Sequence, residues 1–90
     1  MHRDLDISLL RAFLAVVETG SVTAAARLLN RTQAAVSLQL KRLEDGLGQP
    51  LFEREHKRLT LAISGERLLG LARRVIALND EMWERMHTPS

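Results

Sequence analysis

Apolar residues recur at helical spacing at the start of the chain. Over residues 7–19 they lie three or four positions apart, which predicts a core helix ended by Gly20. Ser21 or Thr23 can cap a second, shorter helix that runs to about Leu29. Small and apolar residues share one face of this helix, so another helix can approach it closely.

A third helix follows after a turn of only two residues. Thr32 is a suitable N-cap, and Gly48 with Pro50 ends the helix after Leu47. Its apolar positions fall within a narrow arc of the helical wheel, which predicts a core-facing side made of Val36, Leu40, Leu43 and Leu47. The outward and flanking positions carry few charges, and they are Gln33, Ala34, Ser37, Leu38, Lys41 and Asp45.

Past Pro50 the pattern changes to two short runs of β-prone residues, 51–54 and 58–61. They predict a two-stranded ribbon with a charged tip. A hairpin of this size is not stable alone, so its apolar side chains must pack on the helices. These side chains are Leu51, Phe52, Leu59 and Leu61.

A long helix is predicted from about Ser64 to Met86. Its apolar residues step by four and three, as in a coiled coil, and further apolar residues widen this stripe. One small domain cannot cover so much apolar surface, so a second copy of the chain is the simplest partner. The residues assigned to this dimer interface are Leu68, Ala72, Val75, Asn79, Met82, Trp83 and Met86.

The order of elements predicts a mainly α, winged helix-turn-helix fold over residues 1–62, followed by a linker or dimerisation helix and a frayed tail over 63–90. A short turn before the third helix exposes its first residues, which can then enter the major groove of DNA. Gln33 offers a donor and an acceptor to a base edge, and Ser37 can pair with a base or a phosphate. Ala34 or Leu38 can pack on a thymine methyl group.

Several cations are suited to phosphates rather than to base reading. Lys41 and Arg42 lie on the third helix. Arg54, Lys57 and Arg58 surround the tip of the ribbon, where they can reach a phosphate or an adjacent minor groove. The alternative for the ribbon is that each cation pairs with a nearby glutamate, Glu53 or Glu55.

Composition indicates a folded protein, and its charge is compatible either with an ordinary solvated charged face or with an anionic partner. The net charge is +2, and residues 31–60 hold the whole excess, with six basic and four acidic side chains. There is no cysteine, which excludes disulfides and thiolate metal sites. No apolar run is long enough to cross a membrane, and the first residues do not form a signal peptide. We therefore expect a cytoplasmic protein.

Catalysis is not expected. His2, His56 and His87 are far apart in the sequence and show no metal-ligand spacing, so neither a metal nor another cofactor is predicted. No Gly-rich phosphate loop or nucleophile elbow occurs. The stronger alternative is a winged helix that docks proteins, because a fold alone does not fix a function.

The segment "LLRAFLAVVETGSVTAAARLLNRTQAAVSLQLKRLEDGLGQPLFER" resembles the N-terminal DNA-binding domain of LysR-type transcriptional regulators of bacteria, and the resemblance extends from about Leu5 to Trp83. It implies a homodimer that binds double-stranded DNA with dyad-symmetric half-sites, and linker helices that pair antiparallel. By position, base contacts fall on Gln33, Ala34, Ser37 and Leu38. Backbone or minor-groove contacts fall on Thr32, Arg54 and Lys57.

Three departures from the family pattern matter. Leu38 stands where many members carry a polar or basic residue, which favours an apolar base contact or a weaker one. Ala34 stands where a proline is common, so the first turn of the third helix can fray more easily. The family's threonine cap before the linker helix is replaced by Ala62, and we expect Ser64 to act as the cap and to shift the helix start by about two residues. Family members of ordinary size also carry an effector-binding region, so we expect an excised domain rather than a naturally short protein, with no effector bound by these residues.

Overall fold

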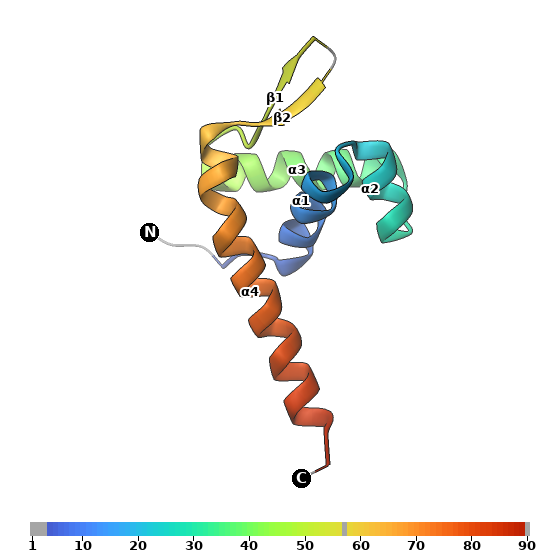
Figure 1. Ribbon diagram of the computed structural model, residues 1–90, viewed down its shortest axis with the longest axis vertical. Coiled ribbons are helices and arrows are strands. Elements are labelled where there is room, and N and C mark those ends of the chain that lie inside the picture. Colours follow the sequence, from blue (N-terminus) through green and yellow to red (C-terminus); the bar gives the residue numbers. More distant parts are fainter. Residues whose placement is uncertain (1–3, 57, 90) are drawn as a thin grey trace.

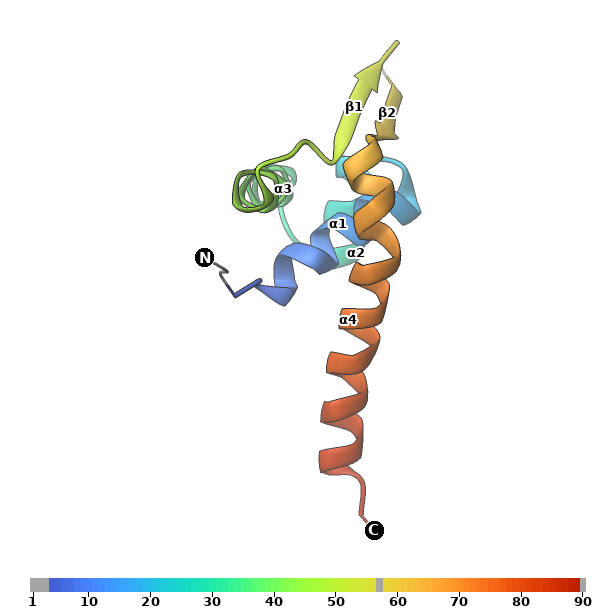
Figure 2. The ribbon, with the colours of Figure 1, turned by 90° about the vertical axis from the view of Figure 1, so that its left-hand side faces the viewer.

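The computed structural model describes residues 4–56 and 58–89, and the fold is mainly helical (Figure 1). Three helices pack together, a two-stranded hairpin projects from them, and a long fourth helix continues beyond them (Figures 1 and 2). The predicted winged helix-turn-helix with a long C-terminal helix is thereby confirmed. The elements are α1 (Ile7–Thr19), α2 (Val22–Leu29), α3 (Gln33–Leu47), β1 (Phe52–Glu55), β2 (Arg58–Leu61) and α4 (Ile63–His87).

Local caps fix the bounds of the first three helices. The side chains of Asp6, Ser21 and Thr32 each accept a hydrogen bond from a backbone amide two or three residues further on, at 2.9–3.1 Å. The predicted bounds of these helices are confirmed, and Ser21 rather than Thr23 caps α2. The residues that follow the helices have left-handed backbone, with φ of 80° at Gly20, 55° at Asn30 and 72° at Gly48.

The core is centred on α1. Its large side chains Leu10, Phe13 and Val16 are fully buried, and alanines on α1 and α2 let these helices approach closely. Of the predicted core face of α3, Val36, Leu40 and Leu43 are buried.

The expected core position of Leu47 is wrong, because its side chain is 38% exposed at the end of α3. Instead Gln39, which was not expected inside, is only 8% exposed. Its Oε1 atom has no hydrogen-bond partner among the described residues.

The hairpin is anchored at its base. Leu51 is fully buried and precedes β1, so the first strand begins one residue later than predicted. The rings of Phe52 and Phe13 pack with centroids 5.5 Å apart. The strands pair antiparallel with Arg54 opposite Leu59. The wing therefore depends on the helices for its stability, as predicted.

The expected cap at Ser64 is wrong. The N-cap of α4 is Ala62, without a side-chain hydrogen bond, and the helix begins at Ile63. Backbone pairing explains this start, because the Ala62 amide donates to the Leu51 carbonyl at 2.9 Å and the Ala62 carbonyl accepts from Glu66 at 3.0 Å. The Ser64 hydroxyl donates to Oε1 of Gln49 instead.

The first half of α4 packs mainly on α1. Ala72 is fully buried in the core of its own chain, so its assignment to a dimer interface is corrected. An ion pair of 2.5 Å joins Arg11 on α1 to Asp80, and this hydrogen bond lowers the pKa of the Asp80 carboxyl. Beyond this point α4 extends away from the other elements (Figure 1). No helix in the described part of the chain has the length and apolarity needed to cross a bilayer.

Gly65 provides the first test of the fold. A Cβ at this position would meet the Leu51 carbonyl oxygen and would lie 2.7 Å from Cδ2 of Leu61. We expect Gly65→Ala to lower the free energy of unfolding by about 1–3 kcal/mol or more, measured by urea denaturation. Gly70→Ala is the matched control, because nothing lies within 4 Å of its added Cβ, and helix propensity should raise stability by up to about 1 kcal/mol. Equal stability of the two variants would contradict this close packing.

Candidate nucleic-acid interface

The outward side of α3 presents uncharged side chains to solvent. Gln33, Ala34, Ser37 and Leu38 are all exposed, and the apolar Leu38 is 46% exposed. The opposite side of the same helix is the buried face that packs on α1 and α2. Because one side of α3 is exposed and the other is buried, the exposed side can enter a groove of another molecule without disturbing the core.

Two cations follow these residues on α3. Lys41 and Arg42 are exposed, and Lys41 lies 3.7 Å from the Asp45 carboxylate one turn later. An exposed ion pair of this kind contributes little stability, so a phosphate can replace the carboxylate at low cost. Both cations therefore remain available to an anionic partner.

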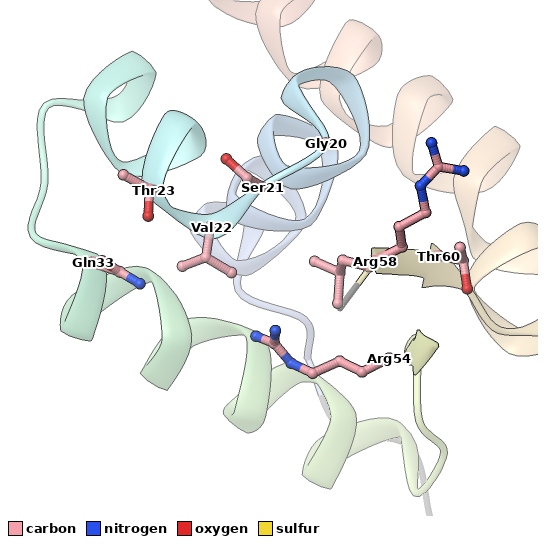
Figure 3. A pocket seen from close by; sticks show the side chains of 9 residues that line it. Gly20, Ser21, Val22, Thr23, Gln33, Arg54, Arg58 and Thr60 are labelled. Atoms are coloured by element: carbon pink, nitrogen blue, oxygen red, sulfur yellow. The ribbon is translucent and has the colours of Figure 1, made fainter. Parts of the chain in front are cut away.

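An open groove of about 470 Å³ lies between the wing and the starts of α2 and α3 (Figure 3). Gln33 lines it from α3, and Arg54 and Arg58 line it from the two strands of the wing. Figure 3 shows the Arg54 side chain extending from β1 toward Gln33 and Val22. The fold thus brings a candidate base-reading residue and a wing arginine, far apart in the sequence, into one groove. The α2 residues along this groove are Val22 and Thr23, preceded by Gly20 and Ser21.

The wing arginines are not neutralised by their glutamate neighbours in the described part of the chain. Glu55 is paired with Arg58 in the strand register, yet their charged groups form no ion pair, and Arg54 forms none with Glu53 or Glu55. The alternative of wing cations bound to glutamates therefore does not hold for Arg54 and Arg58. Lys57 lies outside the described residues.

Glu44 fixes the path from α3 to the wing, a role that sequence reasoning missed. Its carboxylate accepts a hydrogen bond from the Leu51 amide at 2.7 Å, and its carbonyl accepts from Gly48 at 2.8 Å and Gln49 at 3.2 Å. The connection is thus folded back onto the end of α3. Through it, Glu44 holds the wing at a set position relative to the outward face of α3.

No metal-binding constellation occurs in residues 4–56 and 58–89, since no three acidic or histidine side chains come together there.

These features define a winged helix-turn-helix with an exposed recognition helix. Residues 7–66 match the family described as bacterial regulatory helix-turn-helix protein, lysR family. The chain belongs to this family, which is one of DNA-binding transcriptional regulators rather than of enzymes.

Individual relatives agree with the family. The chain is 46% identical over 81 residues to the HTH-type transcriptional regulator DgdR of Burkholderia cepacia, covering 90% of this chain and 28% of that protein. It is 44% identical over 72 residues to the HTH-type transcriptional regulator MetR of Haemophilus influenzae, covering 80% of this chain and 23% of that protein. The chain therefore spans about a quarter of the length of these relatives.

Solved structures share the fold. A crystal structure of a CbnR_DBD-DNA complex superposes with a TM-score of 0.84 and 34% identity, over 91% of this chain and 94% of that one. A crystal structure of CbnR, a LysR family transcriptional regulator, superposes with a TM-score of 0.85 and 34% identity, over 91% of this chain and 28% of that chain. The similarity thus includes a protein solved together with DNA.

The role of Glu44 leads to a second test. Glu44→Ala leaves the Leu51 amide without its carboxylate acceptor, which should lower the free energy of unfolding by about 1–3 kcal/mol. Amide hydrogen exchange at Leu51 should accelerate as well. Asp45→Ala is the control, because it removes only the exposed pair with Lys41 and should cost less than about 1 kcal/mol. A Leu51 amide equally protected in both variants would contradict the anchoring role.

Proposed function

We propose that the chain binds specific sequences of double-stranded DNA as a homodimer and thereby regulates transcription. The recognition helix, residues 32–47, enters the major groove, and the wing, residues 51–61, lies at the adjacent minor groove. The observation that carries the proposal is the groove that joins Gln33 to Arg54, beside an uncharged outward face on α3. The similarity to a DNA-bound relative supports the same geometry.

The side chains divide into two roles. Gln33, Ala34, Ser37 and Leu38 read base edges, because a helix in the major groove presents its outward side to them. The other contacts go to phosphates or to the minor groove, where they position the protein without reading sequence. They come from Thr32, Lys41, Arg42, Arg54, Lys57 and Arg58.

The dimer forms through α4. Leu71, Val75, Leu78 and Met82 are exposed and follow one another by four, three and four residues, so they form one apolar stripe on the helix. A stripe of this length on a protein surface favours a protein partner. Of the interface residues expected from the sequence, Val75, Met82, Trp83 and Met86 are exposed, while Leu68 and Asn79 are half-buried beside them.

The two parts of the chain then have separate tasks. Residues 1–62 bind one half-site, and residues 63–90 join two copies so that both half-sites are read with dyad symmetry. Such a regulator acts in the cytoplasm, and it needs no metal or small molecule for the DNA contact itself.

DNA selection is the direct test. Duplexes selected from a genomic pool should include a preferred site, and Gln33→Ala should cost on the order of 1–3 kcal/mol on it while discrimination at one base pair falls. Lys57→Ala should weaken preferred and random duplexes alike. Binding measured by gel retardation should also fall steeply as salt rises, unlike an apolar protein contact. Failure to retard any duplex at low salt would reject DNA binding, and equal losses for Gln33→Ala on both duplexes would remove Gln33 from the base-reading set.

The dimer has its own test. Val75→Asp or Met82→Asp places a charge in the apolar stripe and should convert the dimer to a monomer in analytical ultracentrifugation. Arg73→Asp is the control. This exposed position faces away from the stripe, so the variant should sediment with the same mass as the unmodified protein. A mass unchanged in all three variants would show that α4 does not form the interface.

A further inference from the structure

The ion pair between Arg11 and Asp80 joins α1 to α4 near the point where α4 leaves the helical domain formed by α1, α2 and α3 (Figure 1). Nη2 of Arg11 lies 2.5 Å from Oδ1 of Asp80, although the two residues are 69 positions apart. The other ion pairs in the described part of the chain each join residues four apart on one helix. Within that part of the chain, this ion pair is therefore the one that connects two separate elements.

Closer to its start, α4 is held by apolar and steric contacts. Gly65 lies against the Leu51 carbonyl, and Ala72 is fully buried. Ile76 is the last apolar residue of α4 that packs against the core in the described chain. Apolar contacts are not directional, so they fix the tilt of a helix less sharply than a hydrogen-bonded ion pair does. The ion pair comes one turn later, about 22 Å along the helix from Gly65, where a small tilt moves α4 most.

Two hydrogen bonds orient the Asp80 carboxylate. The bond from Arg11, together with a second from the Asn79 side chain at 3.3 Å, holds the pKa of this carboxyl below its ordinary value. The side chains of Arg11 and Asp80 are 41% and 56% exposed, so their ion pair adds little to the free energy of unfolding. A small bias is nevertheless enough to select among neighbouring helix angles of similar energy. The pair is therefore suited to position α4 rather than to stabilise the fold.

We propose that Arg11 and Asp80 are positioning residues, whose ion pair holds α4 at one angle on α1 and thereby sets the distance between the two DNA half-sites that the dimer prefers. The proposal rests on the DNA-binding dimer proposed above. The middle of the apolar stripe on α4 lies about twelve residues, or roughly 18 Å, from Gly65. A tilt of about 10° at Gly65 therefore displaces each helical domain by up to roughly 3 Å, and two copies together by almost two base-pair steps of about 3.4 Å.

Spin labels test the angle directly, because the sequence contains no cysteine and only introduced cysteines are labelled. Glu18→Cys on α1 and Glu84→Cys on α4 place the labels at exposed positions, and dilution with unlabelled protein restricts the measured distances to one chain. Pulsed electron paramagnetic resonance should give a narrow distance distribution. Arg11→Glu should broaden or shift this distribution, because two carboxylates then repel each other. Arg11→Glu combined with Asp80→Arg, the charge-swapped variant, should restore the narrow distribution.

Duplexes with different numbers of base pairs between the two half-sites test the consequence for DNA. The unmodified protein should prefer one spacing, and Arg11→Glu should reduce that preference severalfold, with recovery in the charge-swapped variant. Affinity for a duplex with a single half-site should stay the same, because neither residue belongs to α3 or to the wing. Arg85→Ala is the matched control for both measurements, since it removes only the ion pair with Glu81 on the same helix.

Each outcome bears on a separate part of the proposal. A distance distribution that Arg11→Glu leaves unchanged, or that the charge-swapped variant does not restore, would reject the ion pair as the device that holds α4. A changed distribution with an unchanged spacing preference would reject its effect on DNA. If Arg11→Glu unfolds in circular dichroism, raising salt from about 0.05 to 1 M replaces it, because screening of the exposed pair should broaden the distribution of the unmodified protein. If the unmodified protein is a monomer or retards no duplex, the proposed function fails, and the distance distribution alone decides whether the pair holds α4.

Discussion

The structure depends on the backbone of Leu51, where three elements meet. The Leu51 amide donates to the Glu44 carboxylate on α3, its carbonyl accepts from Ala62 at the start of α4, and its side chain is buried in the core. Gly65 lies against the same carbonyl, where no larger residue fits. Recognition helix, wing and long helix therefore share one fixed point.

Uncharged and charged side chains occupy different parts of the candidate interface. The outward face of α3 begins with short or uncharged residues, and the cations follow later on the helix and on the wing. In the DNA complex proposed above, the cations would supply affinity that salt weakens, because phosphates are the same in every sequence, and the uncharged residues would supply preference for particular bases. Because Arg54 and Gln33 line one groove, the proposal puts these two contributions side by side rather than on separate surfaces.

The sequence predicted features that depend on neighbours along the chain and missed those that depend on distant contacts. The first three helices have the expected bounds because Asp6, Ser21 and Thr32 cap them locally and Gly20, Asn30 and Gly48 end them. The exposed face of α3 follows from periodicity in the same way. The start of α4 was misjudged because pairing between Ala62 and Leu51, eleven positions apart, decides it rather than Ser64. Glu44 was missed for the same reason, since its partner belongs to the next element, and no periodicity reveals the buried Gln39.

The faces of α4 show how a correct pattern can still be assigned to the wrong contact. Steps of three and four identify an apolar side on the helix, but they do not say how much of it the chain covers itself. Ala72, a small residue, is used within the chain because it lets α4 approach the core, and the half-buried Leu69 and Ile76 lie on the same side. The larger residues at Leu71, Val75, Leu78 and Met82 are left outside. The free stripe is therefore rotated from the predicted one by less than half a turn, toward the end of α3. Leu71 also lines an open groove together with Leu47 and Leu51, so exposed apolar surface continues from α4 to the end of α3.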